Sequence, residues 1–132
     1  MKALLDTHVL LHWLGDRPRL SRAQRAVIEG AGAENPLWLS DITLWEIATL
    51  HELGRITLDR PLRDWLEAAA APPLVQRVGI SPTIAAEVAA LPSHVHRDPA
   101  DRIIIATARV FGCALLTSDR RIIDAGVVPT VS

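Results

Sequence analysis

Cysteine is almost absent from this chain. Cys113 is the only cysteine among 132 residues, so no internal disulfide can form. A secretory leader is not evident either, because Asp6 and His8 interrupt the short apolar segment that follows Lys2. No apolar run reaches the roughly 20 residues that a membrane-spanning helix needs. These absences argue against a disulfide-stabilised secreted protein and a membrane protein, and we expect a cytoplasmic location.

The chain has no large excess of positive or of negative charge. The formal net charge is −1, so the chain lacks the overall positive field that is typical of many nucleic-acid binders. Lysine is nearly missing too, since Lys2 is the only one and the other basic residues are arginines. What the chain does have is 49% hydrophobic residues, which excludes extensive disorder. Its length is that of one ordinary domain, and we expect a single domain over residues 1–132.

Short apolar segments alternate along the chain with helix-start signals. Strands are expected at residues 2–5, 36–39, 75–80, 113–116 and 127–131. Helices are expected at residues 9–14, 21–30, 42–53, 62–71, 82–91, 99–111 and 119–126, with turns between them. This alternation predicts a three-layer α/β domain, in which helices cover both faces of a parallel sheet.

The helix expected at residues 99–111 carries the most informative stretch. Asp98 is suited to the N-cap, Pro99 to the first helical position, and Asp101 lies in the first turn. An apolar run from Ile103 to Ala108 predicts that this helix enters the protein interior. A carboxylate carried inward with it must be paired, hydrogen-bonded or bound to metal. Asp101 is therefore a candidate site residue.

Three further acids point to the same place. Asp6 follows the first expected strand directly, and Asp119 follows the fourth after two hydroxyl residues. The carboxyl ends of parallel strands share one edge of a sheet, so these acids would meet if their strands are neighbours. Glu46 lies within the apolar stripe of its helix, with Ile42 and Leu50 one turn away on either side. Four clustered carboxylates would repel one another unless a divalent cation such as Mg²⁺ or Mn²⁺ offset their charge.

Helix capping is the simpler interpretation of these acids. Asp6 and Asp119 suit N-caps, and an acid in a first turn, such as Asp101, favours the helix dipole. Capping explains each of these three residues singly. It explains neither the position of Glu46 nor why the capping acids should gather at one sheet edge.

The chain resembles PIN domains, and within them the VapC toxins of bacterial toxin–antitoxin operons. Four segments match that family in order and spacing: Leu4-Leu5-Asp6-Thr7-His8, Leu44-Trp45-Glu46-Ile47-Ala48, Asp98-Pro99-Ala100-Asp101-Arg102 and Leu116-Thr117-Ser118-Asp119. Ala100 is a mild departure, because relatives often have a bulky aromatic residue there. The resemblance implies a sheet of order 3-2-1-4-5, a homodimer and inhibition by a VapB-like antitoxin.

The resemblance also implies an Mg²⁺- or Mn²⁺-dependent endoribonuclease, in which water activated by the metal hydrolyses an RNA phosphodiester. The implied catalytic and metal-binding acids are Asp6, Glu46, Asp101 and Asp119. Thr7 and Ser118 are candidates for holding water at the metal, and Asp98 is expected to cap its helix. Arg102, Arg120 and Arg121 are possible contacts to RNA phosphates, although solvated surface explains them equally well.

Other interpretations remain open at this stage. A PIN-like module could bind RNA or protein without cutting, and a cutting enzyme could be a processing nuclease instead of a toxin. His8 with His12, and His94 with His96, have spacings that zinc ligands use, but a partly exposed helix face is the expectation for both pairs. Tryptophan could mark a partner surface or the core, and we expect Trp45 in the core.

Overall fold

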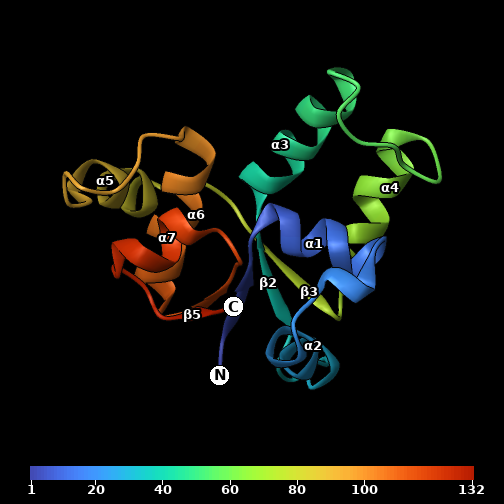
Figure 1. Ribbon diagram of the computed structural model, residues 1–132, viewed down its shortest axis with the longest axis horizontal. Helices are drawn as coiled ribbons and strands as arrows, with labels where there is room; N and C mark the ends of the chain where they lie inside the picture. The colour runs from blue at the N-terminus through green and yellow to red at the C-terminus, as the bar shows by residue number, and fades with distance from the viewer.

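Five short strands form one parallel sheet in the computed structural model, which describes residues 1–132 (Figure 1). The strands are β1 (Ala3–Leu5), β2 (Leu37–Ser40), β3 (Val75–Val78), β4 (Ala114–Leu116) and β5 (Thr130–Val131). Their order is β3-β2-β1-β4-β5, and all neighbouring strands run parallel. The predicted α/β class and the implied strand order are confirmed, and β1 and β4 are neighbours at the centre.

Seven α-helices connect these strands, in the regions where helix-start signals predicted them. They are α1 (Thr7–Leu14), α2 (Arg22–Glu29), α3 (Asp41–Glu52), α4 (Leu62–Ala69), α5 (Pro82–Ala90), α6 (Pro99–Phe111) and α7 (Arg120–Ala125). A short 3₁₀ helix, η1 (Arg17–Arg19), lies where a turn was expected. None of the helices is long and apolar enough to cross a membrane.

Two helix starts show how directly local sequence sets these boundaries. Ser21 and Gln24 form a reciprocal capping box at the start of α2, in which each side chain accepts from the other's backbone N–H. Asp98 caps α6, and Pro99 occupies its first position, where no intrahelical N–H donor is needed. The same helix ends at Gly112, which adopts a left-handed φ of 66°.

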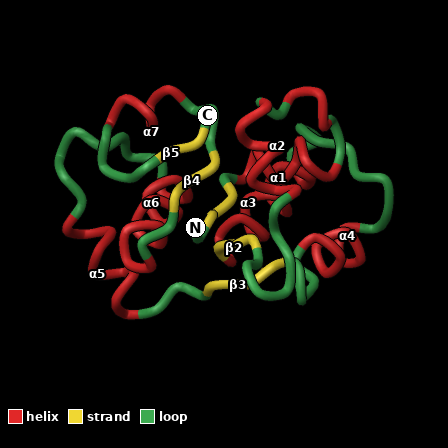
Figure 2. The backbone as a smooth tube through the Cα atoms, turned by 90° about the horizontal axis from the view of Figure 1, so that it is seen from below, coloured by secondary structure: helices red, strands yellow, loops and turns green.

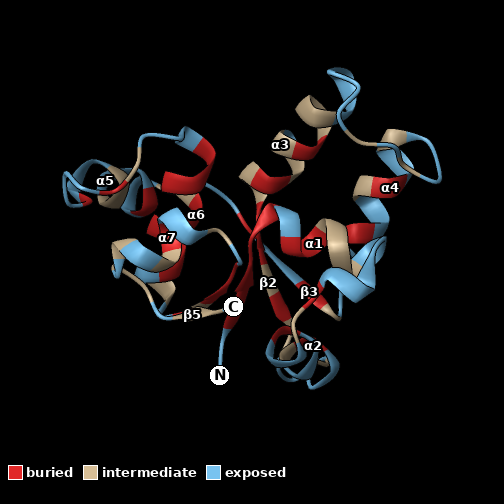
Figure 3. Ribbon diagram, in the orientation of Figure 1, coloured by how far each residue is buried: buried red, intermediate tan, exposed pale blue.

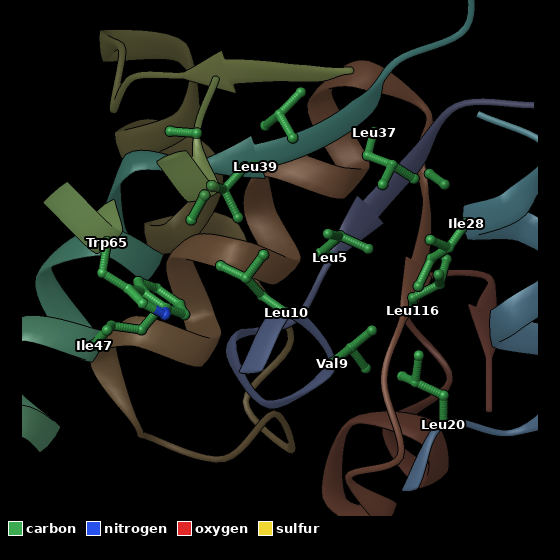
Figure 4. Packing of buried hydrophobic residues seen from close by; sticks show 14 residues of the cluster. Leu5, Val9, Leu10, Leu20, Ile28, Leu37, Leu39, Ile47, Trp65 and Leu116 are labelled. Atoms are coloured by element: carbon green, nitrogen blue, oxygen red, sulfur yellow. The ribbon is translucent and has the colours of Figure 1, made fainter. Parts of the chain in front are cut away.

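Helices cover both faces of the sheet (Figures 1 and 2). Side chains alternate along a strand, so Leu5 and Leu4 of β1 point to opposite faces. Leu5 packs in a buried cluster with residues of α1, α2, α3 and α4, among them Leu10 and Ile47 (Figure 4). Leu4 packs with α6 and α7, where Ile104 is among its buried neighbours. The centre of the sheet is therefore buried from both sides, as Figure 3 shows.

Three details differ from the sequence-based expectations. The third strand ends at Val78, before the turn that leads into α5, and the fifth is confined to Thr130–Val131. Trp45 is 59% exposed on α3, so its expected place in the core is wrong. The buried tryptophan is Trp65 of α4, which packs in the Leu5 cluster.

Candidate active site

The site lies at the carboxyl ends of the central strands, where β1 and β4 lead into α1 and α7 (Figure 1). Leu5 and Leu116 are partners in the parallel register, and Asp6 N–H donates to the Leu116 carbonyl at 3.0 Å. Asp6 is buried directly after β1, and Asp119 follows β4 as the N-cap of α7. The structure thus places these two acids on neighbouring strand ends, as the strand-order argument required.

Thr117 links these two strand ends, and sequence reasoning missed it. Its hydroxyl donates to Asp6 Oδ2 at 2.7 Å and accepts the Asp119 backbone N–H at 3.1 Å. The signal was available, because Thr117 follows Leu116 as Asp6 follows Leu5, and those leucines are in register. Residues in register on adjacent parallel strands are side-chain neighbours. Thr117 holds the Asp6 carboxylate in a fixed orientation.

Capping accounts for only part of the acidic cluster. Asp98 accepts the Asp101 N–H at 3.0 Å, and Asp119 accepts the Arg121 N–H at 2.9 Å. Asp6 occupies an N-cap position but makes no side-chain cap bond, since its carboxylate turns to Thr117. Asp101 and Glu46 cap nothing. Capping therefore does not explain why Asp6, Asp101 and Glu46 lie at this edge.

Glu46 enters the site from α3. It is half-buried, and its carboxylate accepts a hydrogen bond from the hydroxyl of Thr7, the first residue of α1. The Thr7 hydroxyl also lies 3.2 Å from that of Thr43. These two buried threonines fix Glu46 against α1, so the Thr7 hydroxyl already has protein partners.

Asp101 lies at the centre of the cluster. Its Oδ2 is 2.8 Å from His96 Nε2 and 3.6 Å from Arg121 Nη2. Its carboxylate is within 4.8 Å of ligand atoms in two groups, one with His96 and Asp119 and the other with Glu46 and Asp98. Asp6 belongs to neither group, although it lies near enough to Asp101 for their charges to interact.

The carboxyl groups fall into two electrostatic classes. Burial raises the pKa of Asp6, Glu46 and Asp101, and the charges of neighbouring acids raise these pKa values further. Hydrogen bonds from Thr117, Thr7 and His96, respectively, act in the opposite direction. The pKa of Asp119 is instead lowered, chiefly by its hydrogen bonds with Arg121. Three of the four acids therefore lack a full counter-charge from the protein.

Comparison with known proteins decides the family of this chain. The model of the PIN domain matches residues 3–128. The chain belongs to the PIN-domain family. Among its relatives is Ribonuclease VapC22 of Mycobacterium tuberculosis, which is 44% identical over 119 residues, covering 90% of this chain and 88% of the relative. The resemblance that the four sequence segments indicated is confirmed.

Solved structures of other proteins share this fold. A VapBC2 complex from Rickettsia felis, bound to a promoter DNA fragment, matches with a TM-score of 0.74 at 12% identity, covering 99% of this chain and 98% of the other. FitAcB from Neisseria gonorrhoeae matches with a TM-score of 0.70 at 23% identity, covering 98% and 96%. At such low identity, this likeness supports the architecture alone.

The acidic cluster of this PIN domain fits a divalent cation. Carboxylate oxygens are the ligands that Mg²⁺ and Mn²⁺ prefer, and three or more converge around Asp101. Burial of Asp6, Glu46 and Asp101 with raised pKa values shows that these charges are incompletely compensated. A cation placed among them would compensate that charge.

The three arginines flagged in the sequence occupy different environments. Arg102 is buried and donates to the carbonyls of Val88 and Val95, so its guanidinium is held inside the protein and is neither a solvated surface group nor free for the RNA contact that the sequence allowed. Arg120 pairs with Asp124 one turn further along α7. Only Arg121 reaches the acids.

Ser118 and the histidines also differ from expectation. Ser118 is exposed and accepts a hydrogen bond from Gln24 of α2, whereas Thr117 bonds to the acids. His8 and His12 lie on α1, with His8 exposed, as expected for that pair. His94 and His96 lie in the loop before α6 and not on a helix face, which corrects the prediction. His96 is a site residue that helical periodicity could not reveal.

Proposed function

We propose that this PIN domain is a metal-dependent endoribonuclease that acts as the toxin of a toxin–antitoxin pair. The observation that carries the proposal is the convergence of Asp6, Glu46, Asp101 and Asp119 at the carboxyl ends of β1 and β4. Its 44% identity to Ribonuclease VapC22 supports an RNA substrate. The same relative favours a toxin over a processing nuclease.

The proposed cofactor is Mg²⁺ or Mn²⁺, held chiefly by Asp101 with Glu46 and assisted by Asp6 at the end of β1, while Asp119 at the end of β4 completes the acidic cluster. When bound, such a cation supplies Lewis-acid activation of water and stabilises charge on the phosphodiester. The protein's own contribution is orientation. Thr117 fixes Asp6, and Thr7 fixes Glu46, each through a hydroxyl hydrogen bond.

Hydrolysis by this set needs no side-chain nucleophile. The one cysteine, Cys113, is buried between α6 and β4, and burial raises the pKa of its thiol. A non-cutting binding module would gain nothing from Asp6, Glu46 and Asp101 with raised pKa values, because their burial and mutual repulsion destabilise the fold. The site therefore favours catalysis over binding alone.

The decisive experiment is cleavage of total bacterial RNA by the purified chain. We expect cutting with Mg²⁺ or Mn²⁺, none with EDTA, and a loss of about 100-fold or more in Asp101→Asn, because a charged group at the reacting centre is removed. Asp64→Asn is the matched control, since Asp64 is an exposed acid on α4. Metal-independent cutting, or full activity of Asp101→Asn, would reject the assignment.

Expression in cells separates the toxin from a housekeeping nuclease. A toxin should arrest growth when expressed alone, and Asp101→Asn should not.

We propose a VapB-like antitoxin as its partner, a homodimer as the assembly, one functional domain over residues 1–132 and the cytoplasm as the location. Trp45 of α3 and Leu53 at its C-terminal cap are large apolar side chains left exposed, and they are candidates for contact with a partner. Co-expression with the product of a small neighbouring gene should restore growth.

A further inference from the structure

Arg121 is the only cationic side chain of α7 that contacts the acidic cluster. Its Nη2 lies 2.9 Å from Asp119 Oδ2, and its Nε lies 3.3 Å from Asp119 Oδ1. Two donors on the two oxygens of one carboxylate make a forked pair, which fixes the guanidinium in orientation as well as in charge. Arg121 Nη2 also lies 3.6 Å from Asp101 Oδ2. The guanidinium therefore bridges two carboxylates that would otherwise repel each other.

This bridge lies in one of the two groups that could hold a metal ion. Asp101 and Asp119, with His96, form the group on the α7 side. A cation bound there would be held by the same two carboxylates that Arg121 Nη2 approaches. Like charges at such short separation repel strongly in a partly buried site. Arg121 and a metal ion thus compete for this position.

The other group has no such occupant. Glu46 and Asp98 form no ion pair with any lysine or arginine, and the counter-charge near Asp101 comes from the α7 side. The protein neutralises one side of the cluster by itself and leaves the other to an external cation.

Resting on the proposed nuclease function, we propose that Arg121 takes the place of a second metal ion. The chain binds one divalent cation, on the side of Glu46, Asp98 and Asp101. Arg121 supplies the second positive charge between Asp101 and Asp119. Its Nη1 group makes no protein hydrogen bond and its side chain is 62% exposed, so a donor remains free for a phosphate oxygen of the RNA.

Counting bound Mn²⁺ tests the proposal without RNA. The full chain is freed of metal with EDTA, dialysed and titrated with Mn²⁺, and free Mn²⁺ is followed by electron paramagnetic resonance. We expect about one Mn²⁺ per chain for the wild type and about two for Arg121→Gln, because the freed Asp101–Asp119 pair would form a two-metal site. Arg120→Gln removes the same charge one residue earlier and should still bind one.

Arg121→Lys separates the positive charge of Arg121 from its forked hydrogen-bond geometry. Lysine keeps the positive charge but loses the fork, so this variant should bind one Mn²⁺ and cut RNA about 10-fold more slowly. Arg63→Gln is the control for cleavage, because the Arg63 side chain is exposed on the solvent face of α4.

The numbers of bound Mn²⁺ ions decide whether Arg121 takes the place of a second metal ion. Two Mn²⁺ ions in the wild type, or one in Arg121→Gln, would overturn the proposal. Two in Arg121→Lys would do so as well, since charge would then not be what excludes the second ion. These counts are independent of cleavage. A chain that binds one Mn²⁺ but cuts no RNA would contradict the proposed nuclease while leaving the role of Arg121 intact.

Discussion

Asp101 is the residue on which the contacts of the site converge. It belongs to both groups of possible metal ligands, and it contacts His96 and Arg121 through the same oxygen. His96 is the closer of the two, with Nε2 at 2.8 Å from Asp101 Oδ2. Hydrogen bonds to a metal-binding carboxylate orient it and adjust its affinity for the ion. His96 is therefore a positioning residue for Asp101.

We expect His96→Ala to weaken Mn²⁺ binding and RNA cleavage by roughly 10-fold, which is the usual cost of losing a residue that orients a metal ligand. His96→Gln should recover most of that loss, because glutamine Nε2 can occupy the position of the imidazole Nε2. Mn²⁺ titration and cleavage rates measure both. His94→Ala is the control, since His94 bonds only to the Ala125 carbonyl at the surface. Equal loss in Ala and Gln variants would show that the ring, and not its hydrogen bond, is needed.

Different physical reasons explain the residues that sequence reasoning missed or misplaced. Four acids could be predicted because strand ends and helix starts are visible in the sequence. His96 could not, because it lies in a loop whose path no periodicity describes. Trp45 was misplaced because scarcity of aromatic residues says nothing about which helix face is covered. Thr117 was predictable in principle, from its register with Asp6.

At the scale of elements, local signals determined most of the fold. Caps at Ser21 and Asp98 and the glycine after α6 mark helix boundaries that hold in any tertiary context. Strand ends were less predictable, since pairing with a neighbour decides where a strand stops. The environment of Arg102 was equally hidden. It lies in the first turn of α6 but binds carbonyls at the end of α5 and in the following loop.

This buried arginine fixes the loop that carries His96 and Asp98. Arg102→Met keeps much of the side-chain volume but leaves the Val88 and Val95 carbonyls without that donor. We expect a loss of about 1–3 kcal/mol in the free energy of unfolding, the usual cost of a broken buried hydrogen bond. Urea unfolding measures it. We also expect weaker Mn²⁺ binding, because the loop would no longer hold His96 against Asp101.

Arg109→Met is the matched control on the same helix. Arg109 pairs with Glu87 and the Val127 carbonyl in a partly exposed position, so its loss should cost less than that of Arg102. Unchanged stability of Arg102→Met would mean that water replaces the guanidinium at both carbonyls. In that case, the loop would owe its position to the apolar packing of Val95 and to the hydrogen bonds of His94 and His96.

At the scale of the whole molecule, a net charge of −1 conceals a strongly uneven distribution. Several surface acids pair with an arginine, as Asp124 does with Arg120. Asp6, Glu46 and Asp101 are gathered at one sheet edge by the chain's topology, and their pKa values are raised. Overall composition therefore excluded a broad basic nucleic-acid surface but could not reveal a local site. Burial is the main cause of these raised pKa values and repulsion between the acids adds to it, so a bound cation would stabilise the charged forms.

The raised pKa values of these carboxyl groups predict how the stability of the protein depends on pH. A carboxyl whose folded pKa is raised binds more protons when folded than when unfolded, once the pH exceeds about 4. Its contribution to the free energy of unfolding then falls as the pH rises towards the folded pKa. Asp119 has a lowered pKa, so the stability that it contributes at neutral pH is lost only as the pH falls below about 4, towards its folded-state pKa. His12 has a lowered pKa and adds an opposite slope near pH 6.5, so variants must isolate the acids.

Glu46→Gln isolates one of them, because glutamine Oε1 can still accept the Thr7 hydroxyl. In EDTA at pH 7.5 we expect this variant to have a higher Tm than the wild type, with the difference vanishing near pH 4, where the glutamate is protonated in both states. Glu52→Gln, an exposed acid on the same helix, should change the Tm little. Mg²⁺ at 100 times its Kd should stabilise the wild type by about 2.7 kcal/mol, or on the order of 10 °C, and Glu46→Gln by much less. A wild type whose Tm in EDTA exceeds that of Glu46→Gln at pH 7.5 would show that Glu46 is compensated within the protein, and the case for a cation beside it would fail.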